Sequence, residues 1–185
     1  MSTLQVKIIP NSSPTPTQPA VFSPVAMTAN AGDNVTWFND DKQAHWPAPT
    51  ATSPTEWFAF QIPAGSESRG DLALGPNPVA VTAATNGAAT VFTTQGTAPA
   101  NGVTVLLSYS APNPAPNPPS PWQAATKGKS FVVTNLGPNS CSIPLDSTTF
   151  GPLVGTISIG VPYTLNYVCA LHPGETGTIT VNPQQ

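Results

Sequence analysis

Charged side chains are scarce in this chain of 185 residues. Lys and Arg together number 5, Asp and Glu together number 8, and the charged fraction is 7%, against about 25% in an ordinary globular domain. The basic residues form no dense patch, and a protein that binds nucleic acid needs such a patch to neutralise phosphates. Nucleic acid is therefore excluded as an expected partner.

Long apolar runs are also missing. No stretch approaches the roughly 18 apolar residues of a transmembrane helix, so no membrane span is expected. The chain begins Met-Ser-Thr-Leu, without the basic start and apolar stretch of a signal peptide. The low-charge composition, rich in threonine and proline, is nevertheless typical of secreted proteins. We expect a secreted or periplasmic location, with the signal peptide already trimmed.

Helix-forming windows are rare because proline and glycine interrupt them. The chain has Pro 24 and Gly 14, and both residues disfavour helix interiors. The intervening Val, Thr and aromatic residues favour strands and turns, and the apolar fraction of 39% is enough for a core. The composition predicts an all-β protein with long Pro-rich loops. Residues 10–19, which include prolines at 10, 14, 16 and 19, are expected to form one such loop.

The clearest motif lies near the C-terminus. Residues 163–168 alternate between apolar and polar types, as a strand does, and lead into Cys169-Ala-Leu-His172-Pro-Gly-Glu175-Thr-Gly177. A second alternating segment follows Gly177. A thiol, an imidazole and a carboxylate are thereby concentrated on one short loop, and thiolate with imidazole selects copper or zinc among the common metals. The loop predicts a metal site.

Together with an upstream segment, this loop resembles the cupredoxins, the plastocyanin- and amicyanin-like family of copper proteins. Gly32-Asp33-Asn-Val35-Thr-Trp37-Phe-Asn39, followed by His45, matches the family's Gly-Asp-x-Val-x-Trp-x-Asn strand, which precedes its first copper-binding histidine. The resemblance implies a Greek-key β-sandwich that holds one copper ion. It also implies a redox partner protein, and the in-plane copper ligands that it implies are His45, Cys169 and His172.

One departure from the family concerns the axial ligand. Glu175 stands where related loops carry methionine, and the only methionines are Met1 and Met27. A carboxylate is a harder donor than a thioether, favours Cu(II) and should lower the reduction potential. A red or type-2-like copper site with Glu175 in the axial position is the resulting hypothesis. The alternative is that Glu175 points to solvent.

A second departure is the separation of 124 residues between His45 and Cys169, which exceeds the usual cupredoxin spacing. We interpret residues 1–75 plus 156–185 as the cupredoxin-like sandwich. Residues 76–155 are then an inserted β-rich segment that contains a Pro-rich bridge at 111–121. The alternative division takes 1–110 and 122–185 as two cupredoxin-like units.

An internal similarity supports that alternative. Segment 128–135 aligns with segment 32–39, and Cys141 follows the first segment at the spacing at which His45 follows the second. In a tandem layout Cys141 would approach Cys169. A Cys141–Cys169 disulfide would then consume the thiolate, and the protein would be a metal-free structural or assembly module with a cupredoxin fold.

The leading functional hypothesis is a copper-binding protein in electron transfer or copper handling. Catalytic turnover is not favoured, because only two histidines are present and neither lies in a nucleophile motif. A third hypothesis is a copper enzyme with an open coordination position beside His45. The acidic residues Asp33, Asp40 and Asp41 are interpreted as a solvated turn. The sequence leaves the oligomeric state open.

Overall fold

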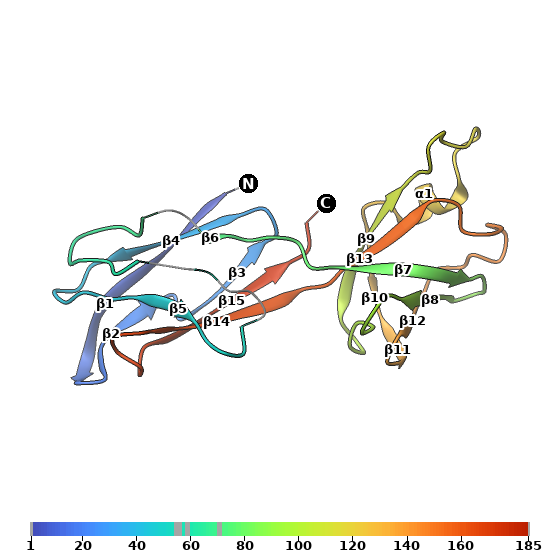
Figure 1. Cartoon of the computed structure of the whole chain (residues 1–185). Helices are drawn as coiled ribbons and strands as arrows, with labels where there is room; N and C mark the ends of the chain where they lie inside the picture. Colours follow the sequence, from blue (N-terminus) through green and yellow to red (C-terminus); the bar gives the residue numbers. More distant parts are fainter. Residues whose placement is uncertain (1, 54–56, 58–59, 70–71, 185) are drawn as a thin grey trace. The chain divides into compact units, whose positions relative to one another are not determined.

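The computed structural model describes residues 2–53, 57, 60–69 and 72–184. The chain divides into two compact units, each built from separate segments (Figure 1). Unit 1 comprises Met1–Gly75 and Tyr163–Asn182, and unit 2 comprises Pro76–Pro162 and Pro183–Gln185. Strands dominate both, and the described residues contain a single short helix, α1 (Pro121–Thr126). The all-β prediction is confirmed. No described helix has the length and apolar character needed to span a membrane.

Unit 1 is a sandwich of two four-stranded sheets that share one core. The first sheet has the order β2 (Gln18–Ser23), β1 (Thr3–Thr15), β4 (Asn34–Asn39) and β6 (Leu72–Ala73). The second has the order β3 (Ala26–Asn30), β15 (Thr176–Asn182), β14 (Tyr163–Cys169) and β5 (Pro47–Pro49). Strands far apart in the sequence are neighbours, since β1 pairs with β4 and β3 pairs with β15, both in parallel.

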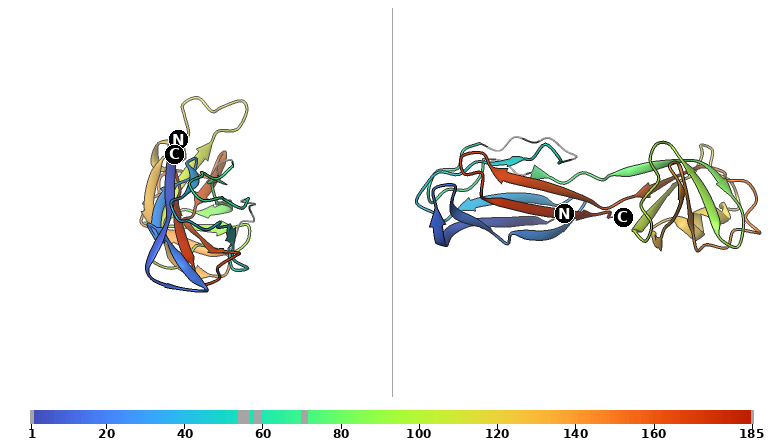
Figure 2. Two further views of the ribbon diagram at one scale, coloured as in Figure 1. Left: turned by 90° about the vertical axis from the view of Figure 1, so that its left-hand side faces the viewer. Right: turned by 90° about the horizontal axis from the view of Figure 1, so that it is seen from below.

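The core of unit 1 follows the two-residue period of its strands. Leu165, Tyr167 and Cys169 are buried in β14 while the residues between them are less buried, as expected where one sheet face packs on the core. In the facing sheet, β4 contributes Val35 and Trp37. Because Cys169 is the last residue of β14, the same alternation places its thiol at one end of the sandwich core. β14 and its antiparallel partner β15 are the adjacent red strands of Figure 2.

The expected loop at residues 10–19 is instead part of a long hairpin. β1 continues to Thr15 and turns into β2 through residues 16 and 17. Beyond Ile8, β1 no longer pairs with β4, and among the described strands its remaining partner is β2. Proline is tolerated on an edge strand because the missing N–H can fall on the unpaired side, so the prolines did not end the strand.

Unit 2 is one seven-stranded sheet that encloses its own core. The strand order is β10 (Lys129–Val132), β9 (Thr104–Ser110), β13 (Thr156–Gly160), β7 (Pro78–Thr85), β8 (Thr90–Thr94), β12 (Ser140–Ile143) and β11 (Thr134–Gly137). The register shifts within β7 between Val81 and Ala83. The strands that precede β7 in this order and the strands that follow it contribute side chains to one core. Leu107 of β9 and Phe92 of β8 meet there with Trp122 of α1.

Residues 156–160 and the Pro-rich bridge both belong to unit 2. Residues 156–160, which were grouped with the sandwich, form β13 and pair with β7 and β9. The Pro-rich bridge 111–121 follows β9 and ends at the first residue of α1, inside the unit. β9 pairs with both β10 and β13, so strands on either side of the bridge belong to one sheet.

Replacement of Gly177 by alanine should destabilise unit 1. Gly177 lies opposite Tyr167 in the β14–β15 ladder, and an added Cβ would overlap the Tyr167 ring, which packs against Phe22 and Trp37. We expect Gly177→Ala to cost about 1–3 kcal/mol through overpacking, measured by denaturant unfolding followed by tryptophan fluorescence. Gly75→Ala is the control, because nothing lies within 4 Å of its added Cβ. Equal stability of the two variants would contradict this account of the core.

Candidate metal centre

Four side chains converge at one end of unit 1. One ligand atom from each of His45, Cys169, His172 and Glu175 lies within 4.8 Å of all the others. The two histidine Nδ1 atoms are 3.3 Å apart, and the Cys169 sulfur lies 3.8 Å from Nδ1 of His45 and 3.6 Å from Nδ1 of His172. The structure therefore brings together all four residues that the sequence nominated as ligands. Such a group can hold a metal ion.

Cys169 is fully buried, and the backbone around it fixes its sulfur. The Trp46 N–H donates to Sγ at 3.3 Å, and the Ala170 N–H donates to the Trp46 carbonyl at 2.8 Å. Cys169 is also paired with Pro47 of β5. These contacts join the end of β14 to the segment that carries His45, so the two parts of the site are held at a fixed separation.

The loop from Cys169 to Glu175 is closed by its own backbone. The His172 N–H donates to the Cys169 carbonyl at 3.2 Å, and the Glu175 N–H donates to the His172 carbonyl at 3.0 Å. The Cys169 N–H in turn donates to the Glu175 carbonyl at 2.9 Å. Three ligand-type side chains are thus displayed by a tight turn between two paired strands.

The tip of this loop rests on the β1–β2 hairpin. The Gly174 N–H donates to the Thr17 carbonyl at 2.9 Å. A Cβ on Gly174 would lie 2.9 Å from that carbonyl oxygen and 3.0 Å from the Gln18 Cβ. Glycine is therefore the residue that permits the loop and the hairpin to approach this closely.

Glu175 faces the site and not the solvent. Its residue is 1% exposed, its Oε1 accepts the Ala20 N–H at 3.0 Å, and its Oε2 lies 2.8 Å from Nδ1 of His45. The alternative that Glu175 points to solvent is wrong. A buried carboxylate needs hydrogen bonds or an opposite charge to offset its desolvation, and Ala20 and His45 supply both.

His45 is buried between two carboxylates. Its backbone forms an isolated bridge with Ile62, and its ring reaches Glu175 through Nδ1 and Asp41 through Nε2, the latter at 3.0 Å. Burial alone would lower the pKa of His45. The hydrogen bonds to Cys169, Glu175 and Asp41, with the Glu175 charge, outweigh burial and raise that pKa to about 10. These contacts therefore favour the protonated form of the ring.

Sequence reasoning missed the role of Asp41. Asp40 is exposed as expected, but Asp33 accepts the N–H groups of Ser2 and Asn30, and Asp41 binds His45. The solvated-turn interpretation is therefore wrong for two of the three acids. Burial would raise the pKa of Asp41, yet the His45 hydrogen bond and two backbone N–H groups hold it below its usual value. The sequence position of Asp41, near a nominated ligand histidine, could have indicated this contact, because ligand histidines commonly have a carboxylate partner.

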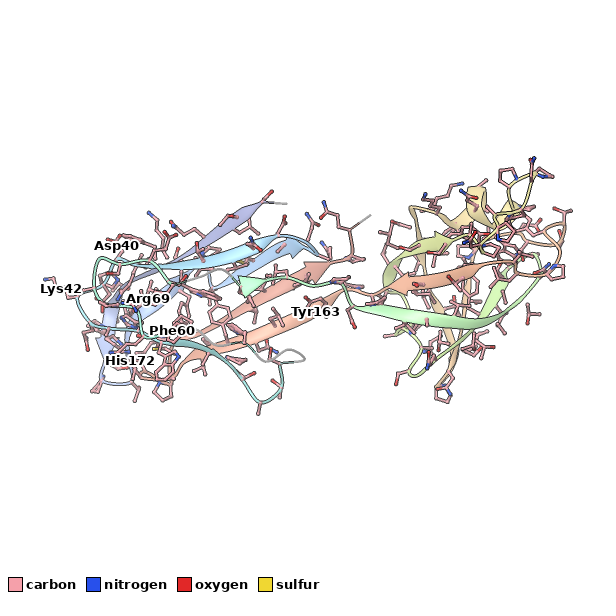
Figure 3. The ribbon with its side chains drawn as sticks, turned by 45° about the horizontal axis from the view of Figure 1, so that its top comes forward. Asp40, Lys42, Phe60, Arg69, Tyr163 and His172 are labelled. Atoms are coloured by element: carbon pink, nitrogen blue, oxygen red, sulfur yellow. The ribbon has the colours of Figure 1, made fainter. Side chains whose placement is uncertain are left out.

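His172 is the most accessible of the four candidate ligands. Its side chain is 13% exposed, and large apolar side chains with substantial exposure lie on the segments around it: Trp46, Phe60 and Leu171. Figure 3 shows His172 and Phe60 at the same end of unit 1 as Asp40 and Lys42, with Tyr163 at the opposite end. Three of the four candidate ligands are therefore buried, and the fourth, His172, reaches the surface.

The proposed Cys141–Cys169 disulfide is not formed. Both cysteines are free. Cys169 belongs to the core of unit 1 and Cys141 to the separate core of unit 2. Burial raises the pKa of the Cys141 thiol, as in a cysteine that packs as a small apolar residue. The disulfide-linked alternative is wrong, and the Cys169 sulfur is available at the site.

No protein-family model and no curated protein matches the chain. Among solved structures, the chain is similar to a novel purple cupredoxin from Nitrosopumilus maritimus. The two are 15% identical, the match covers 96% of this chain and 98% of that chain, and the TM-score is 0.35.

Gly174→Ala should loosen the loop that carries the candidate ligands. The added Cβ would press on the Thr17 backbone, which cannot rotate away as a side-chain end could. We expect the Cys169 thiol, measured in a Cys141→Ala background, to react with a thiol reagent at least several-fold faster in the variant. Gly75→Ala should leave the rate unchanged. An unchanged rate in Gly174→Ala would show that the loop does not depend on this contact.

Proposed function

We propose that the protein is a cupredoxin-like copper protein that binds one copper ion at the end of unit 1. His45, Cys169, His172 and Glu175 would hold the ion. The observation that carries this proposal is the convergence of these four donor atoms within 4.8 Å. Electron transfer or copper handling is the expected role.

The chemistry of the donor set fits copper. A thiolate with imidazoles suits copper and zinc, and a carboxylate adds a hard donor that favours a divalent ion. Thiolate, carboxylate and two neutral imidazoles carry two negative charges, which a divalent cation balances. A copper ion bound there would supply a one-electron redox couple. The same donors also suit zinc, so the test below includes it.

The surroundings of the site support electron transfer over turnover. Backbone hydrogen bonds fix Cys169 and the loop to Glu175, and a rigid ligand set needs little rearrangement when charge changes. Of the four candidate ligands, His172 is the one that reaches the surface, beside exposed Leu171 and near exposed Trp46. A partner protein docked on this apolar rim would exchange electrons through the His172 ring.

The decisive experiment is a titration of the reduced, metal-free protein with Cu(II), followed by visible and electron paramagnetic resonance spectroscopy. We expect one equivalent to bind and to produce a thiolate-to-copper charge-transfer band. The band should disappear in Cys169→Ser and persist in Cys141→Ala, which removes the other buried thiol. Tighter binding of zinc without any such band would favour a zinc site. Failure to bind either metal would leave a metal-free structural module as the better assignment.

A separate variant tests the contribution of His45. The proposed site combines a ligand from residue 45 with ligands from the distant loop at 169–175. Because His45→Ala removes one of the four donors, it should lower Cu(II) affinity by at least about tenfold. Competition with a chromophoric chelator measures this affinity. Copper binding that is unchanged in His45→Ala would mean that residue 45 is not a ligand.

A further inference from the structure

We propose that Asp41 is a positioning residue that directs Nδ1 of His45 toward the metal and biases the site toward Cu(II) over Cu(I). This inference rests on the proposed copper site. It concerns a side chain outside the four candidate ligands, and it begins from the contact of 3.0 Å between Asp41 Oδ2 and Nε2 of His45.

Asp41 is itself held in place. Its backbone N–H donates to Asn39 Oδ1 at 3.0 Å, and its Oδ2 accepts the Gln43 N–H at 3.2 Å. The buried Asn39 side chain closes the same turn, because its Nδ2 donates to the carbonyls of Gln43 and Ile62 at 2.7 and 2.9 Å. The carboxylate is therefore anchored to the end of β4 and to the segment that pairs with His45.

This anchoring decides which ring nitrogen is available. Because Asp41 accepts the hydrogen on Nε2, Nδ1 is the nitrogen that faces Cys169, His172 and Glu175. A hydrogen bond of this kind fixes the orientation of a ligand imidazole and raises its basicity.

The charge of Asp41 has a second effect. Its side chain is 9% exposed, so its field is screened less than that of a surface carboxylate. Cu(II) carries one positive charge more than Cu(I), and a nearby negative charge stabilises the more highly charged ion more strongly. Asp41 adds this preference to that of Glu175, on the opposite side of the His45 ring.

The neighbouring acid provides a matched control. Asp40 is exposed and precedes Asp41 in the same turn, so Asp40→Asn removes the same charge from the chain. Asp41→Asn removes the charge but keeps an oxygen that can accept from Nε2. Asp41→Ala removes both the charge and the acceptor. The three variants separate net charge, local charge and orientation.

The test measures Cu(II) and Cu(I) affinities by chelator competition, together with the reduction potential. In Asp41→Asn we expect Cu(II) affinity to fall by about 10- to 100-fold, as for other outer-shell carboxylates. Cu(I) affinity should fall less, so that the potential rises. Asp41→Ala should lose more Cu(II) affinity still, and Asp40→Asn should match the unaltered protein. If Asp41→Asn does not fold, the potential of Asp41→Ala decides the question.

The outcomes separate this inference from the proposed function. Suppose that the unaltered protein and Asp40→Asn bind copper, and that both Asp41 variants have the same copper affinities and reduction potential as these two proteins. The inference about Asp41 is then overturned, while the copper site stands. An equal fall in Cu(II) and Cu(I) affinity, with no change in potential, would also overturn the bias toward Cu(II). Failure of the unaltered protein to bind copper would overturn the proposed function and this inference with it.

Discussion

The buried carboxylate of Glu175 is the group on which the arrangement of the site depends. An ionised carboxylate out of water is costly unless charge and hydrogen bonds compensate it. Its two oxygens find their partners on segments far away in the sequence, at Ala20 in β2 and at His45 before β5. The C-terminal loop, the N-terminal hairpin and the segment after β4 are therefore tied together at one point. Removal of any one of these partners would leave a polar group buried without compensation.

The second constraint on the site is the direction in which the side chains of β14 point within the sandwich. Side chains alternate between the two faces of a strand, so Leu165 and Tyr167 in the core require Cys169 to face the same way. The strand ends there, and the following turn lifts His172 and Glu175 to the same end of the sandwich. Since a shift of register by one residue would expose the thiol and bury its neighbours, packing of the core also sets the position of the sulfur.

Sequence patterns predicted the local parts of this structure well. The strand at 34–39 and the alternation through 163–169 are encoded by neighbours in the sequence, and the structure shows both as β4 and β14. The short loop at 169–175 that follows β14 could also be predicted from neighbouring residues. Cys169, His172 and Glu175 were nominated because one short loop concentrates them. His45 was added because the order of its segment and this loop resembles that of a known family, not because any local rule places residue 45 beside residue 169.

Local sequence patterns could not predict the contacts between distant segments. The prolines at 10–19 indicated a loop, because the pattern does not reveal that only one side of β1 is paired there. Asp41 looked like a surface acid until the fold placed it on His45. The internal similarity that matched Cys141 to His45 was equally local. In the structure Asn135 and Cys141 are cross-strand partners in the β11–β12 hairpin, whereas Asn39 caps an open turn that leads to His45.

One imidazole offsets the burial of two acidic groups at this site. The His45 ring lies between Asp41 and Glu175, within hydrogen-bonding distance of both. The protonated ring, which these contacts favour, compensates both carboxylates, and its Nδ1 lies 2.8 Å from the Glu175 Oε2. Those are the atoms that a metal ion would take as ligands. On the proposed function, a bound ion would replace the proton on Nδ1 of His45 and its hydrogen bond to Glu175, while backbone hydrogen bonds hold the loop that carries the other donors.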